Sequence, residues 1–213
     1  MKYLKLSLII MVACCFVACG KDQTSTINPL VKELFCFKTG STWTYEGTVY
    51  DAARDTTRNV ILLVNTSSYE ESQFEKHCNE KGRGHKFKEY ILYKINSKML
   101  MSQTFTSKII ADECGVDNTA NVSIVTPLGS ALSFYCYADN TFSIDVEYLS
   151  TYTYKGHKYE DVYVFTQDNG TYYVSKDVGF VRCEKKYNTS SIAKNNNVNS
   201  VTDVWLVDKN VIQ

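Results

Sequence analysis

The stretch KEYILYKINSKMLMSQTF, residues 88–105, decides the fold class. Two runs rich in aliphatic and aromatic residues, 88–95 and 98–105, flank the polar pair Asn96-Ser97. This arrangement is typical of a β-hairpin, because a short polar turn lets two neighbouring strands pair antiparallel. With the turn centred near Asn96, residues whose numbers sum to about 192 should face each other.

That register places two cysteines opposite each other beyond the base of the hairpin. Cys78 and Cys114 are therefore the candidate disulfide, and two unpaired thiols are the alternative. Five cysteines follow residue 19, so at least one thiol stays free or pairs outside the chain. The five are Cys36, Cys78, Cys114, Cys136 and Cys183.

The rest of the chain is also rich in strand patterns. It contains 16 Tyr and 10 Phe but only 2 Pro, a composition that suits pleated, half-buried surfaces. Trp43 and Tyr45 alternate with polar residues, and Arg58–Asn65 is expected to be a strand buried on both faces. Further strands are predicted at Asn121–Thr126, Ala131–Ala138, Phe142–Tyr154, Lys158–Thr166, Thr171–Lys176, Gly179–Lys186 and Thr202–Asp208.

Helical patterns are scarce after residue 19. We predict a polar loop over 66–86, with one helical turn near Glu70–Lys76, and no helix of convincing length elsewhere. Strands at this spacing without helices favour one antiparallel sheet. The predicted fold is therefore all-β, with a single sheet curled into a half-barrel or open barrel over residues 31–213.

The first thirty residues have a different character. Lys2 and Lys5 precede an apolar run over 6–17, which is the build of a secretory signal peptide and is shorter than a membrane-spanning helix. The following Ala18-Cys19-Gly20 resembles the lipobox of bacterial lipoproteins. That resemblance implies removal of residues 1–18, a lipid on Cys19 and a polar tether over 19–30. Cleavage before Cys14 or Cys15 is the alternative.

Two stretches resemble a group of Bacteroidetes-type exported lipoproteins of unknown function. The opening strand of these proteins has a Gly, a Trp and a Tyr, which Gly40, Trp43 and Tyr45 match here. Their closing segments are a tyrosine-rich hairpin, matched here by 159–181, and a last strand, matched by 204–208. The resemblance implies a half-barrel similar to carriers of the lipoprotein pathway. It implies no catalytic residues. It also places the protein at the outer membrane, on the periplasmic face or the cell surface, held there by its lipid.

Residue types that carry chemistry are scattered. His77, Cys78 and His85 offer three zinc ligands at best in a predicted loop, so no metal or cofactor is expected. No G-x-S-x-G elbow occurs, and adjacent carboxylates on strands point to opposite faces, so we predict no catalytic residue. Asp55-Thr56-Thr57 resembles an O-glycosylation sequon of Bacteroidetes-type exported proteins, which makes Thr56 a candidate acceptor.

Charge gives little direction about partners. The chain has 23 basic and 23 acidic residues and no basic stripe, so nucleic acid is not an expected partner. Membrane contact through the lipid, and a protein, glycan or lipid partner in the envelope, are expected instead.

Three functions compete: a non-enzymatic binding or assembly protein, a carrier of a hydrophobic ligand, and, third, an envelope hydrolase. An empty apolar concavity would favour the carrier, and a filled core with an aromatic outer patch would favour the binding protein. Carboxylates converging with a histidine in one pocket would favour the hydrolase.

Overall fold

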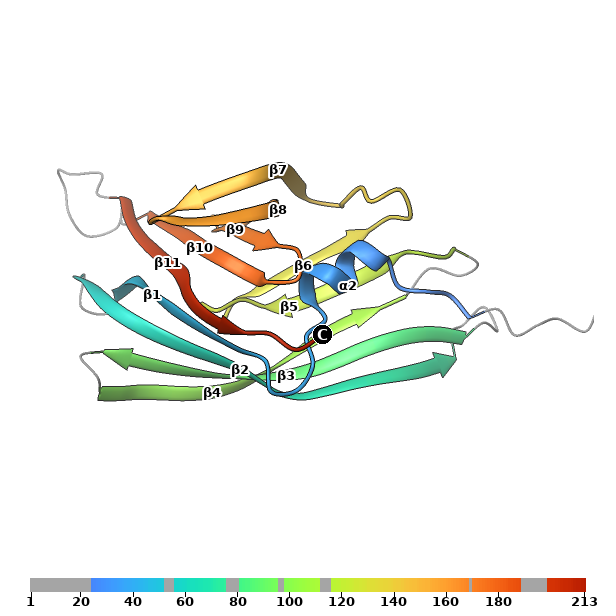
Figure 1. Cartoon of the computed structure of the whole chain (residues 1–213), viewed down its shortest axis with the longest axis horizontal. Helices are drawn as coiled ribbons and strands as arrows, with labels where there is room; N and C mark the ends of the chain where they lie inside the picture. Colours follow the sequence, from blue (N-terminus) through green and yellow to red (C-terminus); the bar gives the residue numbers. More distant parts are fainter. Residues whose placement is uncertain are drawn as a thin grey trace, which may run out of the picture.

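A single curled antiparallel sheet and a short helix make up the described part of the chain (Figure 1). The computed structural model describes residues 24–51, 56–75, 81–95, 98–111, 116–168, 170–188 and 199–213. The elements are α2 (Pro29–Phe35), β1 (Thr42–Asp51), β2 (Thr56–Glu75), β3 (Lys81–Ile95), β4 (Lys98–Ile110), β5 (Ala120–Val125), β6 (Ala131–Cys136), β7 (Asp145–Tyr154), β8 (His157–Gln167), β9 (Gly170–Ser175), β10 (Gly179–Asn188) and β11 (Asn199–Asn210).

The order of strands across the sheet is β6-β5-β4-β3-β2-β1-β11-β10-β9-β8-β7. The first and last strands of the chain, β1 and β11, therefore pair in the middle of the sheet. The predicted class, an all-β fold with one antiparallel sheet curled into a half-barrel, is confirmed. At one edge, the Gln167 side chain binds both backbone groups of Ser133, with its Oε1 accepting at 3.0 Å and its Nε2 donating at 3.1 Å.

The hairpin over 88–105 is present as the paired strands β3 and β4. Its register differs from the prediction by two residues, because Tyr90 faces Thr104 and not Ser102. An irregularity between Tyr93 and Lys94 shifts the pairing near the turn. A register argument from a presumed turn centre does not foresee such a shift.

The predicted loop over 66–86 is wrong. Strand β2 continues to Glu75 and β3 begins at Lys81, so this polar stretch forms a long two-stranded arm. Tyr69 faces Phe87 and Glu71 faces His85 on the inner side of that arm. The backbone ladder continues although the side chains turn polar, because here the sheet extends beyond its apolar core.

The predicted tether is also too long. Thr24 forms a bridge to Lys81, and Ile27 and Leu30 are buried against the domain. Residues 24–30, which the prediction placed in the polar tether, therefore pack on the β domain. Asn28 starts the helix, because its Oδ1 accepts from the Val31 backbone nitrogen at 3.3 Å and satisfies one of the donors that a helix leaves open.

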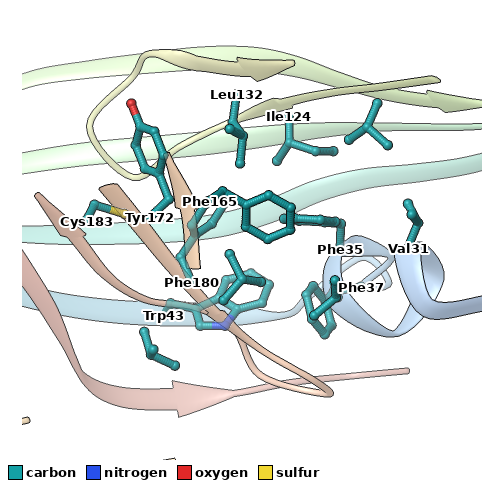
Figure 2. Close-up of a cluster of buried hydrophobic side chains, with 14 of the residues drawn as sticks. Val31, Phe35, Phe37, Trp43, Ile124, Leu132, Phe165, Tyr172, Phe180 and Cys183 are labelled. Atoms are coloured by element: carbon teal, nitrogen blue, oxygen red, sulfur yellow. The ribbon is translucent and has the colours of Figure 1, made fainter. Parts of the chain in front are cut away.

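Helix α2 fills the concave side of the sheet. Phe35 projects from it and meets rings from three different strands at centroid distances of 5.8–6.0 Å (Figure 2); these are Phe134, Phe165 and Phe180. The space left beside them is about 20 Å³, room for about one water molecule. The sequence did not reveal this helix, since seven residues are too few to show a helical period.

Candidate binding groove on the outer face

One row of facing residues crosses the outer side of the sheet. Facing residues on paired strands lie on the same side of a sheet, so pairing alone aligns them. The row runs over seven consecutive strands through Tyr173, Arg182, Trp205, Glu46, Ile61, Lys94 and Met99. The chain neighbours Tyr45, Leu62 and Val204 are buried in the core, so the row faces away from it.

A shallow groove lies along the middle of this row. It has a volume of about 370 Å³ and is lined by Glu46, Gly47, Thr48, Asn59, Val60, Ile61, Lys94 and Trp205. Its lining combines an indole, an aliphatic side chain, a carboxylate, an ammonium group, an amide and a hydroxyl. We call this feature the Trp205 groove.

Gly47 shapes the floor of the Trp205 groove. A Cβ atom at this position would lie 2.1 Å from the Asp203 backbone oxygen and 2.6 Å from the Val204 Cα. Only glycine lets β1 and β11 approach this closely, because the obstructing atoms are backbone atoms that cannot rotate away. The hollow beside Trp205 therefore depends on this residue.

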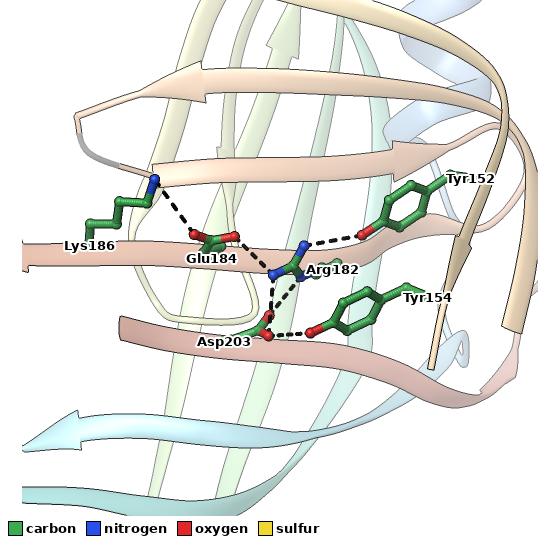
Figure 3. Close-up of polar contacts among 6 residues, drawn as sticks. All are labelled: Tyr152, Tyr154, Arg182, Glu184, Lys186 and Asp203. Atoms are coloured by element: carbon green, nitrogen blue, oxygen red, sulfur yellow. Dashed lines mark hydrogen bonds and ion pairs between the residues drawn. The ribbon is translucent and has the colours of Figure 1, made fainter. Parts of the chain in front are cut away.

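Arg182 forms the centre of a polar cluster next to the groove (Figure 3). Its Nε donates to Asp203 Oδ1 at 2.8 Å, and one Nη donates to Glu184 Oε2 at 2.9 Å. The other Nη donates to the Tyr152 hydroxyl at 3.3 Å. The guanidinium also lies 4.1 Å from the centroid of the Tyr154 ring, within the range of a cation–π contact.

This cluster joins the β7–β8 hairpin to the outer face of β10 and β11. Tyr152 and Tyr154 come from the hairpin, while Arg182 comes from β10 and Asp203 from β11 (Figure 3). Burial, together with a hydrogen bond to Asp203, raises the pKa of Tyr154 to about 12, so its hydroxyl stays protonated and donates. Because carboxylates already bind the guanidinium, the cluster is not an anion-binding site. It fastens the β7–β8 hairpin to β10 and β11, and we call it the Arg182 latch.

The latch also positions the groove wall. The Tyr154 ring meets Trp205 edge-on at 6.0 Å, and the Lys155 ammonium lies 5.1 Å from the centre of a Trp205 ring. These contacts hold the indole from the hairpin side. The same indole lines the groove, together with Glu46, the residue that faces it on β1.

The sequence-predicted site residues do not meet in this region. Cys19, Cys78 and Cys114 lie outside the described residues, so the lipidation site and the candidate disulfide stay predictions. Thr56 is exposed at the first position of β2, where it faces Asp51. This position leaves the candidate O-glycosylation acceptor accessible from solvent.

His85 has a structural role in the described part of the chain. It is buried, and its Nδ1 lies 2.6 Å from the Tyr69 hydroxyl, with which it forms a hydrogen bond. Burial lowers the pKa of His85. Its two predicted companions, His77 and Cys78, lie outside the described residues, and the described ranges contain no group of three His, Cys, Asp or Glu suited to a metal.

The described cysteines are unpaired and protected. Cys136 and Cys183 are buried, and Cys36 is partly buried. Burial raises the pKa of both Cys36 and Cys136 to about 12. A thiol with so high a pKa is a poor nucleophile at neutral pH, because the thiolate is the reactive form.

Glu89 is a charged residue type inside the core. It borders the small cavity near Trp43 and Tyr45, and its Oε2 accepts a hydrogen bond from Ser107 Oγ at 3.4 Å. Burial raises the pKa of Glu89 to about 8. His85 is four residues away on β3, about 13 Å along the strand, so the two groups do not form an acid–base pair.

The groove residues were not predicted as a site. Trp205 lies between Val204 and Leu206, two apolar residues on an alternating strand, so the pattern turns its indole to the outer face. That outward tryptophan is the one signal the sequence offered. No comparable sequence signal marks Glu46, Ile61 and Lys94, because only the strand register brings them beside Trp205.

Comparisons with known proteins find a likeness to a solved structure and no match to a family model. No family model matches the chain, and no curated protein matches it. One solved structure that it resembles is that of a "putative lipoprotein" from Parabacteroides distasonis, with 12% identity and a TM-score of 0.42. The match covers 83% of this chain and 99% of that chain. In the described residues, no helix has the length and apolar character needed to cross a bilayer.

Proposed function

We propose that this protein is a lipid-anchored envelope protein that binds a partner, without catalysis, through the Trp205 groove. The observation that carries the proposal is the contrast between the two faces of the sheet. The inner face is filled by α2 and its aromatic contacts, whereas the outer face keeps an open groove beside a tryptophan. A filled core with an aromatic outer patch favours a binding protein.

A carrier of hydrophobic ligands is the alternative, and the cavity volume disfavours it. Ligand sites for drug-sized molecules span roughly 300–1,000 Å³, whereas the cavity that the described residues line beside α2 measures about 20 Å³. Accommodating an acyl chain there would require α2 to leave. That movement would expose Leu34 and Phe35, which are almost fully buried.

The proposed anchor constrains how the domain sits on a membrane. Four residues lie between Cys19 and Thr24, so a lipid on Cys19 would hold Thr24 within about 18 Å of its attachment point. Thr24 bridges Lys81 at the start of β3, and Lys94 in the groove lies near the end of the same strand. Thirteen residues of strand span about 40 Å, so the groove lies at the end of β3 that is far from the anchor.

The anchor is tested by replacing the cysteine. Cys19→Ala should abolish labelling by a palmitate analogue and release the protein from the membrane fraction, because multiple acyl chains are needed for firm attachment. The matched controls Cys14→Ala and Cys15→Ala should keep both properties. Retention of label in Cys19→Ala, or its loss in Cys14→Ala, would contradict the assignment. Density-gradient separation of the envelope then tests residence in the outer membrane.

The binding role is tested by what co-purifies with the native, membrane-extracted protein. Wild type should retain a partner that is lost from Trp205→Ala and from Thr48→Arg, which places a long side chain in the groove. Tyr137→Ala removes an aromatic residue of 44% exposure elsewhere and should keep that partner. If mass spectrometry finds the same co-purifying molecules for all four proteins, the groove is not the binding site.

A further inference from the structure

The Trp205 groove has the lining of a site for a polyhydroxylated chain. An indole face is flat and apolar, and it suits the C–H face of a pyranose ring, which is apolar while the ring edge carries hydroxyls. Beside it, Glu46 offers acceptors, Lys94 offers donors, and Asn59 offers both. Sugar hydroxyls donate and accept at once, so a mixed set of this kind matches them.

Charge argues against an anionic polymer or phosphate in the same groove. Glu46 and Lys94 bring opposite charges, which leaves the lining without net charge. Two further cations lie next to the lining, and one of them, Lys155, is placed over a Trp205 ring. The other, Arg182, already binds Asp203 and Glu184 at 2.8 and 2.9 Å. Its donors are therefore engaged within the latch.

The shape argues for a chain lying across the strands. The groove lining comes from β11, β1, β2 and β3, which are neighbours in the sheet. Three steps between strands span about 14 Å, long enough for about three pyranose rings. Tyr154 and Lys155 of the β7–β8 hairpin bound the groove at its β11 end, so a longer chain would extend past its β3 end.

We infer that the Trp205 groove binds an uncharged saccharide chain, with one sugar ring stacked on the Trp205 indole. The inference rests on the proposed function, since it names the ligand class of the same groove. Glu46, Thr48, Asn59 and Lys94 bind the hydroxyls around that ring.

Affinity electrophoresis of the full-length, detergent-solubilised protein tests this inference. The probes are soluble polysaccharides cast in native gels: a mixed-linkage glucan, starch, xylan and yeast mannan, with heparin as the anionic comparison. At least one uncharged probe should retard wild type, and Trp205→Ala should weaken that retardation about tenfold, the loss expected for one aromatic stacking contact. Trp205→Phe keeps a flat ring and should retain binding within about threefold.

Two further variants keep the result interpretable if Trp205→Ala folds poorly. Thr48→Arg fills the groove from an outward position and should abolish retardation while circular dichroism stays unchanged. Tyr137→Ala should bind like wild type. Retardation that survives both Trp205→Ala and Thr48→Arg would refute the site, and retardation by heparin alone would refute the uncharged class.

The outcome also separates this inference from the proposed function. If no saccharide retards the protein while a co-purifying partner still depends on Trp205 and Thr48, the saccharide class is wrong and the groove remains the binding site. If the co-purifying molecules are equally insensitive to both substitutions, the inference and the proposed function fail together.

Discussion

The carboxyl group of Glu89 should make the stability of this protein depend strongly on pH. Glu89 is buried among apolar side chains beside a small cavity, and the described hydrogen-bond partner is Ser107 at 3.4 Å. Burial raises the pKa of Glu89 from 4.5 to about 8, because the charged form loses its hydration. Replacing it by the neutral isostere Gln removes this ionisation from the folded state.

The size of the effect follows from the two pKa values. Below pH 4.5, Glu89 is protonated in both the folded and the unfolded chain, so it does not make the free energy of unfolding depend on pH. Between pH 4.5 and about 8 only the unfolded chain releases the proton, and each pH unit lowers stability by about 1.4 kcal/mol. At pH 7 the loss is about 3 kcal/mol, and above pH 8 it levels off at about 5 kcal/mol.

Glu89→Gln should therefore gain stability over wild type as the pH rises. The variant should gain about 3 kcal/mol between pH 4.5 and pH 7, relative to wild type, or about 10 °C in melting temperature for a domain of this size. Urea unfolding at pH 4.5, 7 and 9 measures the difference. The exposed Glu70→Gln on β2 is the control and should run parallel to wild type. Equal pH dependence of Glu89→Gln and wild type would refute the burial argument.

Three further outcomes follow from the outer face and the thiols. Gly47→Ala should lower stability by about 1–3 kcal/mol in urea unfolding, because its Cβ would meet a backbone oxygen at 2.1 Å, while the adjacent Thr48→Ala should change stability by less than about 0.5 kcal/mol. Arg182→Ala should cost about 3 kcal/mol and speed amide hydrogen exchange in 145–154, since Asp203 and Glu184 both lose the guanidinium that binds them. The exposed Lys186→Ala should do neither, and unchanged exchange in Arg182→Ala would argue against the latch. The buried Cys136 thiol should resist iodoacetamide at pH 8 until the protein is unfolded, and rapid labelling of the native protein would show that the thiol is accessible.

The strands could be predicted from sequence because their causes are local. Alternation over 41–49 and the two apolar runs of 88–105 give the period-two pattern of half-buried strands. The structure places strands at Thr42–Asp51, Lys81–Ile95 and Lys98–Ile110. β1 and β3 bury one face, so burial and sequence pattern agree there, whereas Met99 and Met101 at the start of β4 are exposed.

The remaining features depend on distant partners. The arm over 66–86 carries polar side chains on both faces, and pairing between Glu71 and His85 extends the ladder where no apolar pattern marks it. Helix α2 is short, and it is held by Asn28, whose amide donates to Asn140 Oδ1 at 2.9 Å, 112 residues away. Interactions at that separation leave no trace in a local window of sequence.

The Trp205 groove shows why the site was harder to predict than the fold. Its wall residue has a local signal, an outward tryptophan on an apolar strand, but its other members come from β1, β2 and β3 and meet only through register. A one-residue slip in any of these pairings would turn the slipped residue toward the core. Site prediction therefore needed the register itself, and the register predicted for β3 and β4 was two residues off.

The way this sheet fills its inner face leaves its outer face to carry the specific interactions. Phe35 and its ring contacts occupy the concavity, so the inside offers stability and little room. On the outside, the Arg182 latch draws the β7–β8 hairpin down, and the hairpin in turn holds Trp205 through Tyr154. Because the groove wall is held by the latch, loosening Arg182 should weaken groove binding without any change in the groove lining. A groove that kept full affinity in Arg182→Ala would mean that Trp205 is oriented by its own strand alone.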